Sequence, residues 1–263
     1  MSLQMLVSAV EKDVHVLAAQ MNLEADAVIV NQCGRFSYEE YSHGNCRMRC
    51  YSLKEKGVGL SRNTALMRAD RELCLFADED IVYQTGYAQM VEDEFEKNAE
   101  ADMLLFNVKV APERKTYWNT EKKRIHWYNY GRYPAYSIAA RTEALHRANV
   151  SFSLLFGGGA RYSNGEDSLF LRDCLKKGLR IYASPLVIGE EIPRESTWFH
   201  GYNEKFFADR GVLYRYLYGK PAILFALRFL WTHRKTMGLA DREKLHSACQ
   251  WMKNGIQEAK NSR

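Results

Sequence analysis

The chain has 263 residues, of which 46% are hydrophobic and 26% are charged, a composition typical of a globular protein with a substantial apolar core. Its net charge of +5 comes from 37 Lys and Arg against 32 Asp and Glu, an excess too small to indicate nucleic-acid binding by itself. That excess does suit an anionic ligand or an anionic membrane surface. The length fits one large domain, or one domain with an appendage.

No apolar run in the sequence approaches the roughly 20 residues that a membrane-spanning helix requires. The first 20 residues are interrupted by the charged run Glu-Lys-Asp at 11–13, which is not typical of a signal peptide. The six cysteines are scattered, and Cys74 and Cys174 fall in apolar segments, as reduced thiols commonly do. We therefore expect a cytoplasmic protein.

Strand-like and helix-like segments alternate through the first 110 residues. Helical spacing of apolar residues predicts helices at 11–23, 60–70 and 87–98. This alternation indicates an α/β fold with a mainly parallel sheet flanked by helices. The apolar runs that predict its strands lie at 5–10, 25–34, 46–53, 73–77 and 102–110.

Polar residues follow three of these strands, where the carboxyl ends of a parallel sheet form the usual ligand-binding rim. They are Ser8 to Val10, Asn31-Gln32 and Asp78-Glu79-Asp80. An extended backbone directs residues 78 and 80 to the same side, where two carboxylates suit a hard divalent cation. Glu79 then points the other way and can be structural. The D-x-D pattern alone is equally typical of an acidic turn.

The second half of the chain is less regular. Residues 112–135 are rich in aromatic and basic side chains, which suit a surface hairpin, a platform for a carbohydrate acceptor, or single-stranded nucleic acid. Because no RNA-binding motif accompanies them, we expect no nucleic-acid partner. A helical stripe follows the glycine run 157–159, within residues 164–178. After about residue 212 the sequence predicts helices only, including one at 241–260.

Four blocks of sequence, in order along residues 5–211, resemble the family 2 glycosyltransferases. They are KGVGLSRNTALMRAD, RELCLFADED, NGEDSLFLRDCLKKGLRIYA and STWFHGYNEKFFADRG. The resemblance implies a GT-A fold over residues 1–212, with a nucleotide-sugar half up to about 110 and an acceptor half after it. Residues 213–263 would form a helical C-terminal extension. It further implies an inverting enzyme that moves a sugar from a nucleotide sugar to a hydroxyl acceptor, in polysaccharide or glycolipid assembly.

The resemblance also assigns roles to individual residues. Asp80 would bind a Mn²⁺ or Mg²⁺ ion that bridges the nucleotide diphosphate, with His200 as a further ligand. Asp167 would be the general base, with Glu166 beside it. A metal ion neutralises the charge that grows on the diphosphate, and a carboxylate can remove the proton of the attacking hydroxyl. Nucleotide contacts would come from Ser8, Ala9, Asn31, Gln32, Arg62 and Asp78, and an acceptor contact from Trp198.

Each assignment has a plainer alternative. Acidic residues commonly occupy first helical turns, and a lone His or Trp in WFHGY is often a packing residue. The chain also departs from the family after the first two strands, where SAVE replaces a Pro-x-Tyr-Asn-like stretch and NQCG replaces an Asp-rich turn. The base of the donor therefore stays open, with UDP favoured. A non-catalytic binding or scaffold protein with a glycosyltransferase-like fold is the alternative function.

The apolar and basic stretch PAILFALRFLWTHRK at 221–235 is too short to span a bilayer. One interpretation is a helix that lies on the inner face of the membrane, with Trp231 and the basic residues at the lipid headgroups. The other is a helix that packs on its own domain or on a partner chain, such as a second copy in a homodimer.

Overall fold

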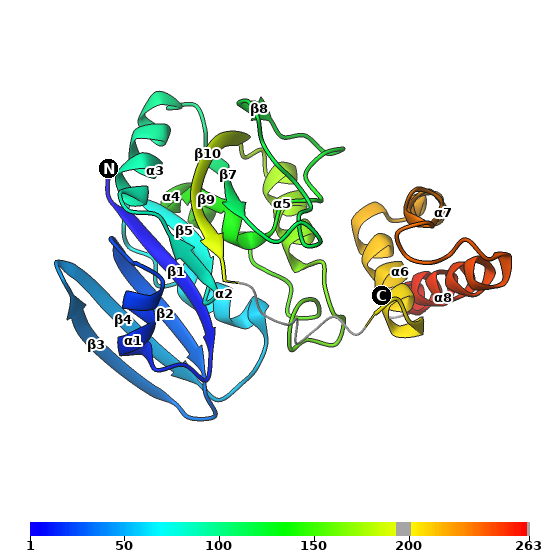
Figure 1. The fold of residues 1–263 in the computed structure, drawn as a ribbon, viewed down its shortest axis with the longest axis horizontal. Coiled ribbons are helices and arrows are strands. Elements are labelled where there is room, and N and C mark those ends of the chain that lie inside the picture. The colour runs from blue at the N-terminus through cyan, green and yellow to red at the C-terminus, as the bar shows by residue number, and fades with distance from the viewer. Residues whose placement is uncertain (193–200, 262–263) are drawn as a thin grey trace.

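The computed structural model describes residues 1–192 and 201–261. Ten strands form one sheet in the order β3-β4-β2-β1-β5-β9-β7-β10-β6, with β8 paired to β10 (Figure 1). The strands are β1 Leu3–Val10, β2 Asp26–Gln32, β3 Ser37–His43, β4 Cys46–Leu53, β5 Leu73–Asp78, β6 Ile81–Tyr83, β7 Met103–Lys109, β8 Lys123–Arg124, β9 Ile138–Arg141 and β10 Ile181–Glu191.

Most strands of the sheet run in one direction. Strands β4, β2, β1 and β5 are mutually parallel, and β10 is parallel to β7. Because β9 is antiparallel to both β5 and β7, these two groups share one direction. Antiparallel β3 and β6 close the two edges. The expected α/β architecture with a mainly parallel sheet is therefore confirmed.

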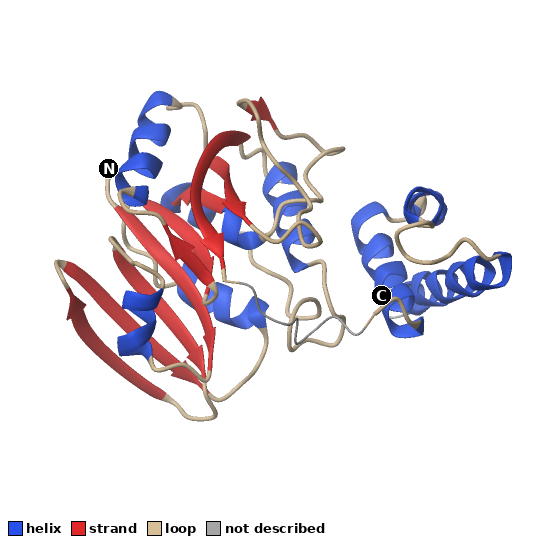
Figure 2. Ribbon diagram, in the orientation of Figure 1, coloured by secondary structure: helices blue, strands red, loops and turns tan. Residues whose placement is uncertain are grey.

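Helices cover both faces of the sheet (Figure 2). They are α1 Val14–Gln20, α2 Val58–Leu66, α3 Tyr87–Lys97, α4 Thr142–Ala148 and α5 Glu166–Lys176, with a short 3-10 helix at Ala135–Ser137. All strands and helices predicted before residue 110 are present, with ends shifted by a few residues. Helix α1 is shorter than predicted because the Asp13 side chain accepts a hydrogen bond from His15 N–H and caps it there.

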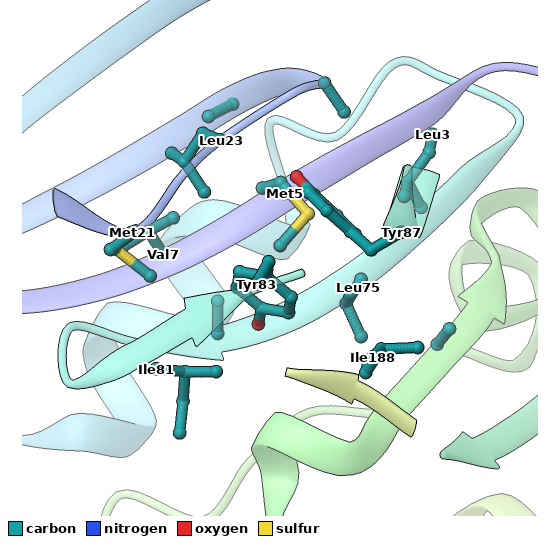
Figure 3. Close-up of a cluster of buried hydrophobic side chains, with 14 of the residues drawn as sticks. Leu3, Met5, Val7, Met21, Leu23, Leu75, Ile81, Tyr83, Tyr87 and Ile188 are labelled. Atoms are coloured by element: carbon teal, nitrogen blue, oxygen red, sulfur yellow. The ribbon is translucent and has the colours of Figure 1, made fainter. Parts of the chain in front are cut away.

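The core has two layers because successive side chains of a strand point to opposite faces. In β1, Met5 and Val7 pack with α1 and α3, whereas Leu6 packs with α2 and α5. Figure 3 shows the first layer, where Tyr83 and Tyr87 lie in one cluster with Met5 and Val7 of β1 and Leu75 of β5. Each fully buried aromatic or aliphatic side chain of this kind contributes about 1.5–3 kcal/mol to folding.

The aromatic and basic segment 112–135 is not a surface hairpin, so that interpretation is wrong. Its only described strand, β8, pairs with β10 rather than within the segment. Tyr117, Tyr130 and Tyr133 are buried in the second core layer. Asn119 anchors the segment, since its side-chain amide donates to the carbonyls of Leu105 and Ser184 at 2.9 and 3.2 Å.

Three helices follow the sheet: α6 Glu204–Tyr218, α7 Ala222–His233 and α8 Arg242–Asn261. Helices α6 and α8 approach closely, since a Cβ added to Gly255 would lie 2.0 Å from the Ala208 carbonyl oxygen. The expected boundary between residues 212 and 213 falls inside α6, which begins at Glu204. In the described ranges, no helix is long and apolar enough to cross a membrane.

Candidate active site

The carboxyl ends of β1, β2 and β5 meet as expected. In the sheet register, Ser8 pairs with Val30 and Asp78, and Val10 pairs with Gln32. Beside these ends lies a cavity of about 250 Å³. It is lined by Ser8, Val10, Gln32, Lys56, Gly57, Val58, Arg62, Asp78, Glu79, Asp80, Arg114, Gly158, Gly159, Glu166 and Glu191.

Arg62 joins acids that are far apart in the sequence. Its side chain is only 4% exposed, and one terminal nitrogen donates to Asp78 Oδ1 at 2.9 Å. The other donates to Glu166 Oε1 and to Asp167 Oδ1, both at 3.0 Å. Helix α2 thus brings the end of β5 and the start of α5 to one point. Charge-assisted hydrogen bonds to Arg62 thus connect Asp78 of the D-x-D segment with the Glu166-Asp167 pair.

Burial acts on the pKa of Asp167 and of Arg62 in this cluster. It raises the pKa of Asp167 well above the ordinary value of 3.8; the Glu166 charge adds to this effect, and Arg62 opposes it. Burial alone would lower the pKa of Arg62, but the charges of Asp78, Asp167 and Glu166 outweigh it and raise that pKa. The guanidinium therefore stays charged, while Asp167 holds a proton more strongly than an exposed Asp.

The residue after Arg62 fixes the segment of chain that precedes α5. The Asn63 side chain donates to the Phe152 carbonyl at 2.9 Å and accepts from the Phe152 N–H at 2.7 Å. The Phe152 ring stacks on Phe170 of α5 at 4.0 Å between centroids. The Arg-Asn pair thus has two functions: Arg62 binds the acids, and Asn63 fixes the loop that precedes them.

The glycine loop before α5 lets these groups approach. The Gly158 carbonyl accepts from the Val58 N–H at 2.9 Å, which closes the loop over the start of α2. Gly157 has a φ of +103°, and a Cβ there would lie 2.7 Å from Glu166 Cδ. A side chain at this position would therefore strain the backbone and displace Glu166.

The other two acids of the D-x-D segment differ in role. The Glu79 carboxylate accepts the Val10 N–H at 2.6 Å and lies 3.6 Å from Lys12 Nζ, so it ties β5 to β1. The structural contact expected for Glu79 is present, but residues 79 and 80 form a turn and Glu79 also lines the cavity, so the extended geometry from which its role was inferred is wrong. Asp80 is largely buried and lines the cavity, and its carbonyl accepts the Ile192 N–H at 2.8 Å.

The predicted nucleotide residues separate into two groups. Ser8 and Gln32 line the cavity, and Gln32 accepts the Gly57 N–H at 2.5 Å. Ala9 lies in the apolar core, and the Asn31 amide bonds the backbone of Lys12 at 2.7 and 3.2 Å. Their nucleotide contacts stay a prediction, as does a direct contact by Arg62. His200 and Trp198 lie outside the described residues.

Three charged residues of the cavity, Lys56, Arg114 and Glu191, were not predicted from the sequence. The Glu191 side chain is buried at the end of β10, and its carboxylate lies 2.6 Å from Arg114 Nη1. Lys56 also lines the cavity. The β10 strand was not predicted, so nothing in the sequence placed Glu191 beside Asp80. Arg114 lies in the aromatic and basic segment, where its charge was one among many.

The cavity suits a cation as well as an anion. Five carboxylates line it against three basic side chains, so an additional cation would offset the excess negative charge. Within residues 1–192 and 201–261, no three His, Cys, Asp or Glu side chains are arranged as a metal site. An ion that bridges a diphosphate usually takes only one or two protein carboxylates and completes its shell with phosphate and water. Asp80 fits that limited role.

We compared the sequence and the structure with those of known proteins. No protein-family model matches the chain, and no curated protein matches its sequence. Among solved structures, residues 1–349 of S. aureus TarS in complex with UDP-GlcNAc match with a TM-score of 0.65 and 17% identity over 98% of this chain and 82% of that one. The same fragment with UDP gives 0.59 and 15%, over 100% and 91%. A longer TarS structure gives 0.58 and 14%, over 100% and 55%.

At this level of identity the comparison shows the fold alone. The chain has the α/β GT-A architecture of TarS, with helices at its C-terminal end. The fold expected from the sequence is thereby confirmed.

Proposed function

We propose that this chain is an inverting glycosyltransferase that moves a sugar from a UDP-sugar to a hydroxyl of a carbohydrate or lipid-linked acceptor. The observation that carries the proposal is the Arg62 cluster, which gathers Asp78, Glu166 and Asp167 beside a cavity at the strand ends. Carboxylates in such a place suit proton transfer and metal-assisted phosphate binding. The shared fold with TarS, which was crystallised with UDP-GlcNAc, supports a UDP-sugar as donor.

In this proposal Asp167 takes the proton of the acceptor hydroxyl. The oxygen then forms a bond to the anomeric carbon of the sugar as the bond to UDP breaks on the opposite face, which inverts the configuration. The Asp167 side chain is 23% exposed and the Glu166 side chain 10%, but only Glu166 is among the residues that line the cavity; Asp167 lies beside it on the same Arg62 nitrogen. The raised pKa of Asp167 makes it a stronger proton acceptor once ionised.

Arg62 acts through the acids it binds. It keeps Asp167 and Glu166 in place at the start of α5 and orients Asp78 toward the nucleotide. Ser8 and Gln32 would contact the nucleotide at the ends of β1 and β2. Asp80 would hold a Mn²⁺ or Mg²⁺ ion, which when bound supplies positive charge to the departing diphosphate.

A screen of nucleotide sugars for nucleotide release, with and without acceptor candidates and divalent cation, tests this function. We expect release from a UDP-sugar in the presence of Mn²⁺ or Mg²⁺. Asp167→Asn should retain UDP binding but lose transfer by at least about a hundredfold, the usual loss when a general base is removed. Asp93 of α3, a half-buried acid that does not line the cavity, serves as the matched control in the variant Asp93→Asn. If Glu166→Gln loses transfer while Asp167→Asn keeps it, the base is Glu166.

A further inference from the structure

Helix α7 carries three large apolar side chains that are exposed on one face. Leu224, Leu227 and Trp231 are exposed at 65%, 45% and 64%. At about 100° of rotation per residue, these three positions lie within an arc of roughly 60°. The opposite side of α7 holds Ala226 and Leu230, which are buried in a cluster with α6 and α8. The exposed leucines and Trp231 are therefore not needed for the packing of α7 on its own chain.

The surroundings of this face are basic. Between Asp209 and Asp241 the sequence contains six Lys and Arg residues and no Asp or Glu. Arg228 is exposed and lies close to Leu224 around the helix, and Lys220 and Lys235 flank the two ends of α7. The Arg234 guanidinium lies 3.9 Å from the centroid of the exposed Trp231 ring. An apolar strip with a Trp and a basic border is the pattern of a helix that lies in a membrane interface.

We propose that α7 docks this face on an anionic lipid surface, with Leu224, Leu227 and Trp231 among the acyl chains and the basic residues at the headgroups. This proposal does not depend on glycosyl transfer. Charge complementarity decides between a lipid surface and a second copy of the chain. A two-fold contact through α7 would place the same patch on both copies, so the basic residues of both copies would gather at one interface. The stretch from residue 210 to 240 offers no carboxylate to pair with them.

Co-sedimentation of the full chain with vesicles tests the proposal. One set of vesicles contains equal parts phosphatidylglycerol and phosphatidylcholine, and the other contains phosphatidylcholine alone. We expect retention on the anionic vesicles and at least tenfold weaker retention on the neutral ones. Because each basic residue near an anionic surface contributes about fivefold to binding, Arg228→Glu should weaken retention by at least that factor, and raised salt should weaken it further.

Apolar and folding controls complete the experiment. Leu224→Ser combined with Trp231→Ser should abolish retention, whereas Met67→Ser removes an exposed apolar side chain at the end of α2 and should leave it unchanged. Unchanged circular dichroism and melting temperature of each variant show that it is folded. No retention of the intact chain, or equal retention of the α7 double variant, would overturn the proposal. Sedimentation velocity without lipid is the second measurement: a dimer that Trp231→Ser dissociates would assign the face to a second copy instead.

Discussion

Replacing Arg62 by methionine would remove the one guanidinium that Asp78, Glu166 and Asp167 share. Methionine preserves much of the apolar length of the side chain, so the change tests charge more than packing. Removing one partner of a buried ion pair costs about 3–5 kcal/mol of folding free energy, because the remaining charge is left uncompensated. We expect a loss of that size at pH 7.

The loss of folding free energy in Arg62→Met should depend on pH. The variant can avoid an uncompensated carboxylate by keeping it protonated in the folded state. At pH 7 this costs about 4 kcal/mol, since the pH is about 3 units above an ordinary Asp pKa and each unit corresponds to 1.36 kcal/mol. At pH 5 the same protonation costs about 1.5 kcal/mol. The folded variant then binds more protons than its unfolded state, so its deficit relative to wild type should shrink by about 2–3 kcal/mol from pH 7 to pH 5.

Urea unfolding at the two pH values measures these differences directly. Arg68→Met is the matched control, because Arg68 directly follows the same helix. Its side chain donates to the Thr64 carbonyl at 3.0 Å and lies over the Tyr51 ring. We expect this variant to lose about 1 kcal/mol at both pH values. A loss of unfolding free energy under about 1 kcal/mol for Arg62→Met at pH 7, or an equal loss at pH 5, would contradict this electrostatic role of Arg62.

Three further predictions concern the same structure. Folding raises the pKa of Asp167, so above pH 3.8 the ligand-free folded protein binds more protons than the unfolded chain. The free energy of unfolding should therefore fall as the pH rises through this window. Urea titrations should show this slope in the wild type and not in Asp167→Asn. Gly157→Ala should lower kcat/KM, because the added Cβ displaces Glu166. Gly44→Ala is its control: Gly44 also has a positive φ but has nothing within 4 Å, so this variant should lose only about 1 kcal/mol of folding free energy. Asn119→Ala should cost about 1–3 kcal/mol in urea unfolding, because it leaves buried carbonyls unpaired.

The regular part of the fold was predictable because its patterns are local. Buried parallel strands such as β5 are continuous apolar runs in the sequence. In α3, Tyr87, Val91 and Phe95 recur at helical spacing. The edge strand β3 (SYEEYSH) was not predicted, since its polar and exposed residues lack an apolar pattern. In segment 112–135 the sequence could not distinguish surface aromatics from core ones. Burial of Tyr117 and Tyr133 is decided by contacts with distant strands.

The site was predictable only in part for a similar reason. Strand-end geometry and the family resemblance pointed to Asp78, Asp80, Glu166 and Asp167 on one rim. The central position of Arg62 among them depends on the approach of α2 to α5, which no local pattern encodes.

The central claim is that the cavity holds the diphosphate of a UDP-sugar beside a metal ion bound at Asp80. Calorimetric titration of the full chain with UDP, in the presence of Mn²⁺ and after its removal by EDTA, tests this most directly. We predict binding with Mn²⁺ that weakens at least tenfold in EDTA and in Asp80→Asn, while Asp93→Asn binds as wild type does. Equal UDP affinity with and without the metal and in Asp80→Asn, or no UDP binding under either condition, would contradict the claim.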